Sequence, residues 1–273
     1  YQGDITLVDK CASVLEMTKF IKEHLGNNAT IHNKDSLKDL ITGALKYDYC
    51  VLNPPFGTKT LTMNTDILNL YELGRGRKKQ EIGILFVELG LKLLKPKGIL
   101  FAIVPNGYLG NTKSDYVAMR RMIIDKYTLL GIIKLPDNAF ARSGTGVATS
   151  ILIIQNKKPK KKYSIFIEDV KTIGYTLNKK NTPFKYKMTS DGYYQCDKDS
   201  NPILDEELTN DKKLFQRFVF KKKISNLLFT NTPHRPAYQS FKKSDMDLNL
   251  IFDIKRYLDI YKNTIDACKK SNY

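Results

Sequence analysis

The chain has 273 residues, of which 42% are hydrophobic, and its 45 Lys and Arg against 28 Asp and Glu give a formal net charge of +17. This apolar content is enough for one sizeable core and excludes an intrinsically disordered chain. The positive charge predicts a polyanionic partner, with nucleic acid as the leading class, although a lysine-rich genome would produce the same excess.

The cysteines and histidines show no spacing typical of a metal site. There is no C-x-x-C pair, and the three histidines are scattered along the chain. A lone Cys50 in an apolar run suits a reducing compartment, and the sequence shows neither a signal peptide nor a long apolar span. We therefore expect a cytoplasmic, prokaryotic protein with no membrane partner and no metal.

The first predicted unit is a strand followed by a helix. Residues 5–8 form a short apolar run that ends at Asp9, and apolar residues then recur at helical spacing over 12–25. An acid at this place binds ribose hydroxyls in nucleotide-binding α/β folds, and it can equally cap the following helix. A weak strand over 29–32 leads to Asp35 and Ser36, where Asp35 again suits a cap, for a helix over 37–45.

The next strand carries the most informative stretch. The apolar run 49–52 ends at Asn53, because Pro54 and Pro55 cannot continue a strand ladder. The carboxamide of Asn53 and the Pro54 carbonyl could accept hydrogen bonds from an exocyclic amino group, while Phe56 covers the face of a flat base. The alternative is an ordinary turn with a partly buried phenylalanine.

A long loop is expected over residues 58–80. Loops of this length in a compact domain are usually functional or mobile. Its basic cluster, Arg75, Arg77, Lys78 and Lys79, would meet phosphates beside the base pocket, or it is a solvated charge run.

Strands and helices alternate in the remainder, which predicts an α/β fold with a mostly parallel sheet and right-handed crossovers. Helices are expected over 82–94 and 119–124, and strands over 98–105, 130–136, 144–154 and 163–168. Phe140 lies between two of these strands and is either a second wall of the pocket or a core residue. The basic turn 157–162 is placed on the surface, away from the pocket.

Several of these stretches together resemble the N6-adenine DNA methyltransferases. Asn53-Pro54-Pro55-Phe56 after a strand is similar to their amino-group methyltransferase motif. The stretches 135–140 (Leu-Pro-x-x-x-Phe) and 145–151 (Thr-Gly-x-x-Thr-x-Ile) resemble the modification subunits of type I restriction systems. The resemblance runs from about residue 5 to residue 211.

The resemblance implies a Rossmann-like sheet and S-adenosylmethionine as cofactor. It assigns the cofactor ribose to Asp9, the cofactor adenine to Asp35 with Ser36, and catalysis to the motif from Asn53 to Phe56, where Asn53 also borders the cofactor. The family's glycine-rich loop and first strand, which precede the ribose acid, are not found before Asp9. Either the chain is a fragment or the cofactor site is degenerate, and we expect a fragment.

The sequence therefore predicts a catalytic domain over 1–211 and an extension over 212–273 that begins a target-recognition or helical region. The expected activity is methylation of a flipped adenine in double-stranded DNA. The expected partners are a specificity subunit or fused recognition domain, and a restriction subunit. The alternatives are a non-catalytic DNA-binding or assembly module derived from such an enzyme, and an RNA or protein amino-group methyltransferase.

Overall fold

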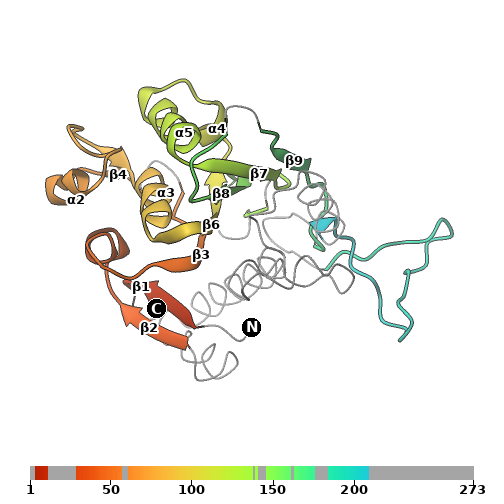
Figure 1. Ribbon diagram of the computed structural model, residues 1–273. Coiled ribbons are helices and arrows are strands. Elements are labelled where there is room, and N and C mark those ends of the chain that lie inside the picture. Colours follow the sequence, from red (N-terminus) through yellow and green to blue (C-terminus); the bar gives the residue numbers. More distant parts are fainter. Residues whose placement is uncertain are drawn as a thin grey trace.

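The computed structural model describes residues 4–11, 29–56, 61–137, 139–140, 146–160, 163–175 and 184–208. Its centre is a five-stranded sheet with the order β3-β6-β8-β7-β9 (Figure 1). The strands are β3 (Tyr47–Leu52), β6 (Leu94–Pro105), β7 (Thr128–Lys134), β8 (Thr149–Gln155) and β9 (Phe166–Asp169). Two shorter pairs are β1 (Ile5–Asp9) with β2 (Ala29–Asn33), and β4 (Leu61–Thr62) with β5 (Gln80–Glu81).

Four of the five central strands run in one direction. β3 pairs with β6 and β7 pairs with β9 in parallel, whereas β8 is antiparallel to both of its neighbours. The expectation of a mostly parallel α/β sheet is confirmed. β8 follows β7 after the connection 135–148, whose described residues contain no crossover helix of the kind that joins parallel neighbours.

The two faces of the sheet have separate cores. On β6, Leu100, Ala102 and Val104 face one cluster, and the alternating residues Ile99, Phe101 and Ile103 face the other. The first cluster is covered by α3 (Ile82–Lys92) and α5 (Ser114–Lys126), which lie on the same side of the sheet (Figure 1). The uninterrupted apolar run of β6 is therefore explained by burial on both faces.

The segment predicted as a long loop is more ordered than expected, and that prediction is wrong. Its described part contains β4, the helix α2 (Thr65–Leu70) and β5. Asn64 caps α2 by accepting a hydrogen bond from the Ile67 amide at 3.1 Å. The helix expected over 37–45 is instead a single π-helical turn, η1 (Ser36–Leu40), and a short helix α4 (Gly107–Gly110) was not predicted. The helix expected over 12–25 lies outside the described residues.

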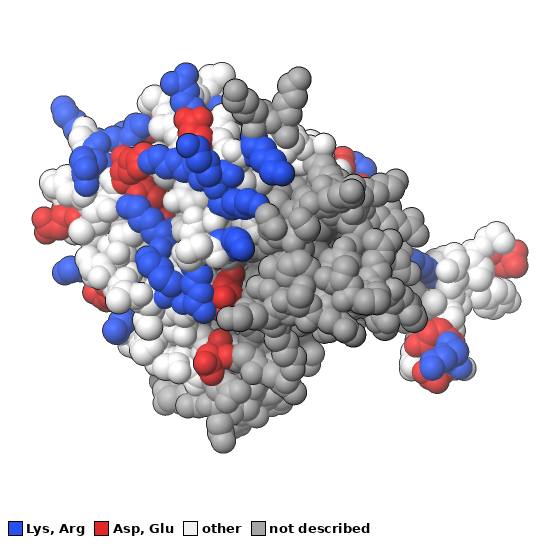
Figure 2. Space-filling model, in the orientation of Figure 1, with Lys and Arg blue, Asp and Glu red and all other residues white. Residues whose placement is uncertain are grey.

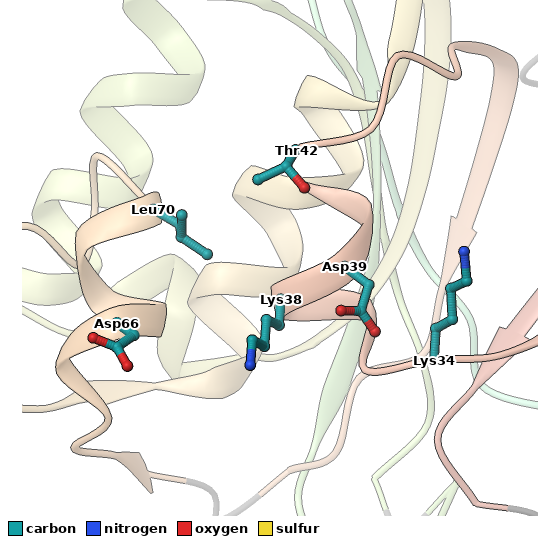
Figure 3. Close-up of a pocket in the computed structure, with 6 residues that line it drawn as sticks. All are labelled: Lys34, Lys38, Asp39, Thr42, Asp66 and Leu70. Atoms are coloured by element: carbon teal, nitrogen blue, oxygen red, sulfur yellow. The ribbon is translucent and has the colours of Figure 1, made fainter.

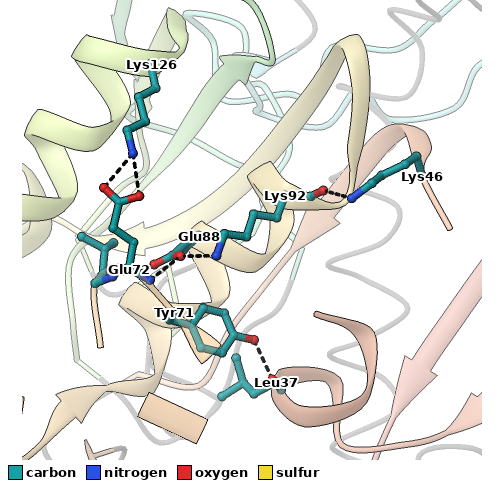
Figure 4. Close-up of polar contacts among 8 residues, drawn as sticks. Leu37, Lys46, Tyr71, Glu72, Glu88, Lys92 and Lys126 are labelled. Atoms are coloured by element: carbon teal, nitrogen blue, oxygen red, sulfur yellow. Dashed lines mark hydrogen bonds and ion pairs between the residues drawn. The ribbon is translucent and has the colours of Figure 1, made fainter. Parts of the chain in front are cut away.

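A buried carboxylate holds this segment against α3. Glu88, whose side chain is 2% exposed, accepts hydrogen bonds from the amides of Glu72 and Leu73 at 2.7 and 2.8 Å and pairs with Lys92 at 2.7 Å (Figure 4). Tyr71 donates its hydroxyl to the Leu37 carbonyl at 2.7 Å, which ties η1 to the same network. Burial raises the pKa of the Tyr71 phenol, and the nearby carboxylates raise it further, so the donor stays protonated.

We predict that Glu88→Gln destabilises the chain by about 3 kcal/mol, because it leaves buried amides and the Lys92 ammonium without their carboxylate. The matched control is Glu72→Gln, which removes only an exposed ion pair to Lys126 and should cost less than about 1 kcal/mol. Urea unfolding of the two variants measures both changes. Equal destabilisation by the two substitutions would show that the Glu88 network is not an anchor.

Candidate active site

The chain turns away from the sheet directly after β3. Pro54 is buried and Pro55 is exposed, and neither can donate a ladder hydrogen bond. Asn53 is half-buried at the carboxyl end of β3, and its Oδ1 atom is buried with no hydrogen-bond partner among the described residues. A buried acceptor without a donor is destabilising in itself, so this atom is poised to accept a hydrogen bond from a ligand.

The two phenylalanines assigned to the pocket are in contact. Phe56 and Phe140 lie edge to face, with ring centroids 5.7 Å apart and an interplanar angle of 76°. Phe140 comes from the connection between β7 and β8, far from Phe56 in sequence, and both rings pack against the second core cluster. The structure therefore brings the two rings together, and their packing also fits the alternative in which Phe140 is a core residue.

The adjoining strand ends contribute further polar groups to this edge. Asn106, just after β6, accepts a hydrogen bond from the Ser150 hydroxyl at 2.7 Å. Thr149 at the start of β8 is fully buried, and its hydroxyl has no partner among the described residues. Thr149 falls within one of the motifs noted in the sequence, but no role was predicted for it.

The two acids assigned to the cofactor follow neighbouring parallel strands. Asp9 ends β1 and accepts the Cys11 amide at 2.8 Å, and Asp35 follows β2 and accepts the Leu37 amide at 3.1 Å. Asp35 thus caps η1, which was the alternative that the sequence left open, and Ser36 is the first residue of that turn. These hydrogen bonds use one oxygen of each carboxylate, and the described contacts leave the second oxygen available. Paired acids with free acceptors fit the hydroxyl and amino groups of a nucleoside.

Cys50 lies in β3 three residues before Asn53. Burial raises the pKa of its thiol to about 12, so the group is uncharged at neutral pH. Cys50 packs against the first core cluster, whereas Val51 and Phe56 pack against the second, so its thiol lies on the other face of the sheet. No group of three or more potential metal ligands occurs in the described part of the chain.

The predicted phosphate-binding residues divide into two kinds. Arg75, Lys78 and Lys79 are exposed, whereas Arg77 is half-buried and forms an ion pair with Asp115. This segment precedes α3, which runs back toward the start of β6, so it lies at the same edge of the sheet as Asn53. Basic side chains form a band over α5 and α3 on the face shown in Figure 2.

The basic turn after β8 lies at the opposite edge. The amide of Lys97, near the start of β6, donates to the Asn156 carbonyl at 2.8 Å, which joins the two turns. Desolvation lowers the pKa of Lys157, and the like charges of Lys160 and Lys97 lower it further. These lysines therefore form a cluster separate from the pocket, in agreement with the expectation from the sequence.

An open hollow of about 680 Å³ lies between η1 and α2 (Figure 3). It is lined by Lys34, Lys38, Asp39, Thr42, Asp66 and Leu70. None of the residues predicted for the site lines it, although Asp35 and Ser36 directly follow the lining residue Lys34 in sequence.

Within the described residues, no helix is long and apolar enough to cross a membrane.

Comparison with known proteins identifies the family. The N-6 DNA Methylase family model matches residues 7–243, which is most of the chain. The chain belongs to the N-6 DNA methylase family. The match continues past residue 211, where a domain boundary was expected from the sequence, and that boundary remains a prediction. Membership implies S-adenosylmethionine as the cofactor.

Solved structures share the fold of this N-6 DNA methylase chain. A modification subunit of a type I restriction enzyme from Vibrio vulnificus YJ016 is 20% identical, with a TM-score of 0.51, and covers 70% of this chain and 38% of its own. A structure of a type I restriction-modification system is 18% identical, with a TM-score of 0.55, and the match covers 97% of this chain and 54% of that chain. The type I restriction-modification methyltransferase subunit from Streptococcus thermophilus is 16% identical, with a TM-score of 0.50, and the match covers 82% of this chain and 49% of that chain.

The methylase chain therefore spans between 38% and 54% of the length of these structures. A search of curated proteins finds no match.

We predict that Cys50 resists alkylation by iodoacetamide at pH 8, because a thiol with a pKa of about 12 has almost no thiolate there. Cys196 is exposed and serves as the control that should react readily. Peptide mass spectrometry of the native and urea-unfolded chain measures both sites. Reaction of Cys50 in the native chain at the rate of Cys196 would contradict the raised pKa of the Cys50 thiol.

Proposed function

We propose that this chain carries the catalytic part of an enzyme that methylates the N6 amino group of adenine in DNA, within a restriction-modification system. The observation that carries the proposal is the buried Oδ1 of Asn53 at the end of β3, which has no hydrogen-bond partner among the residues that the structure describes, together with the contacting rings of Phe56 and Phe140. A flat base with an exocyclic amine suits this combination of a hydrogen-bond acceptor and an aromatic surface.

The proposed reaction is a direct methyl transfer. S-adenosylmethionine supplies an electrophilic methyl group on a sulfonium sulfur. Asn53 Oδ1 and the Pro54 carbonyl accept hydrogen bonds from the adenine amine and orient its lone pair toward the methyl carbon. With that cofactor bound, the methyl group would pass to the amine nitrogen as its bond to sulfur breaks, and the amine would then release a proton to solvent. The contribution of the chain is mainly positioning, which is effective because the two reacting groups are held in line.

The target base must leave the duplex to reach this site. The amine of a paired adenine is engaged inside the helix, so the base is proposed to flip out and stack on Phe56. Asp9 and Asp35 are proposed to bind the ribose and adenine of the cofactor with their free carboxylate oxygens, and Ser36 to adjoin the adenine. Specificity and restriction subunits, or a fused recognition domain, are the proposed partners.

Substitution tests the proposed roles at the pocket. In the intact protein, Asn53→Ala and Phe56→Ala should each reduce methyl transfer to DNA by about 100-fold or more, because each removes a positioned contact. The control is Phe184→Ala, which removes an exposed ring (66% exposed) and should leave transfer unchanged. Transfer of labelled methyl groups to unmethylated DNA is the measurement, with thermal melting to check the fold. Normal transfer by Asn53→Ala would rule out the assignment.

DNA binding should depend on the basic residues at the pocket edge. Changing Arg75, Lys78 and Lys79 to Ser should weaken duplex binding about equally on all sequences and flatten its salt dependence, by about 0.9 in log–log slope for each phosphate that is no longer neutralised. Arg77 is left intact because it pairs with Asp115. The matched control changes Lys157, Lys158 and Lys160 at the opposite edge, which removes the same charge. Equal effects of the two triple variants would mean that DNA binding depends on the net positive charge of the chain and not on the position of these residues.

A further inference from the structure

The hydroxyl of Thr149 is a buried polar group with no hydrogen-bond partner in the described part of the chain. Thr149 is 0% exposed, and among the described residues its Oγ1 and Asn53 Oδ1 are the two buried side-chain atoms without a hydrogen bond. Burying a hydroxyl without a partner costs free energy, and valine would fill the same volume without that cost. The position therefore calls for an explanation outside packing.

Thr149 lies on the same face and edge of the sheet as Asn53. On β8, Ile151 and Ile153 face the second core cluster, and alternation places Thr149 on that face. On β3, Tyr49 and Val51 pack against the same cluster, and Asn53 is the next residue in that alternation. Only β6 separates the two strands, so they are about 10 Å apart, and side chains converging from both can reach one bound molecule.

The backbone around Thr149 also supports the proposed pocket wall. The Leu135 amide donates to the Thr149 carbonyl at 3.0 Å, which fixes the start of the connection that carries Phe140. The neighbouring residue, Ser150, faces the opposite side and has its hydroxyl satisfied by Asn106 at 2.7 Å. The Ser150 hydroxyl therefore has a hydrogen-bond partner, whereas the adjacent Thr149 hydroxyl has none among the described residues.

We propose that the Thr149 hydroxyl is a second polar contact of the substrate pocket and donates a hydrogen bond to a ring nitrogen of the flipped adenine. This inference rests on the proposed function. A hydroxyl can donate, whereas Asn53 Oδ1 can only accept, so the two groups together match a base that presents an amino donor beside a ring acceptor. Thr149 then fixes the rotation of the base about the amine that Asn53 holds.

The test compares Thr149→Val with Thr149→Ser and Ser150→Ala in the intact protein. Thr149→Val keeps the shape and removes the hydroxyl, so it should raise the melting temperature and lower kcat/KM for unmethylated DNA about 10-fold to 100-fold, leaving the KM for S-adenosylmethionine unchanged. Thr149→Ser keeps a hydroxyl and should restore most of the activity. Ser150→Ala should lower the melting temperature and leave the KM for DNA unchanged.

The outcomes separate this proposal from the function on which it rests. A stabilised Thr149→Val with normal kcat/KM for DNA would mean that the hydroxyl is only a packing defect. A destabilised Thr149→Val that binds both substrates more weakly to the same degree would mean a structural role, and either result overturns the proposal. If the wild-type protein transfers no methyl group to DNA, the proposed function itself fails and the Thr149 contact fails with it.

Discussion

The end of β3 is the constraint on which the site depends. Two consecutive prolines stop strand pairing after Leu52, while β6 beside it continues to Pro105. The chain must therefore leave the sheet at its carboxyl edge, which is where open α/β sheets bind their ligands. Asn53 is held at that point by a rigid backbone on one side and a sheet strand on the other.

A second tie fixes the surroundings of this edge. Glu88 gathers the amides that follow Tyr71, and Tyr71 in turn holds the turn that contains Ser36 and is capped by Asp35. The Glu88 carboxylate on α3 thus holds the segment 71–73, which contacts η1 through Tyr71 and leads into the basic residues 75–79. The arrangement explains why a stretch without clear periodicity adopts a defined structure.

Local patterns in the sequence were enough to predict two central strands and the turn that follows one of them. The apolar runs of β3 and β6 and the proline pair identified both strands and the turn carrying Asn53, whereas the choice between a pocket wall and a core residue for Phe140 stays a prediction. The elements α2 and β5 were missed because they are short, and the segment between them is held by Glu88, which accepts the amides of Glu72 and Leu73. Asn64, Thr65 and Asp66 did offer a capping signal for α2. The hydroxyl of Thr149, which has no partner among the described residues, is buried by the pairing of β8 with β6, a contact distant in sequence that no local pattern reports.

The edge-to-face contact of Phe56 and Phe140 has a consequence for how the site discriminates among ligands. If a base binds there as proposed, it meets two rings that already contact one another edge to face. Aromatic stacking accepts any flat ring, so the hydrogen bonds to the buried polar atoms beside the rings would decide which planar molecule is retained. A pocket built in this way would reject flat molecules that lack matching hydrogen-bonding groups, and it would do so without any part of the fold having to repel them.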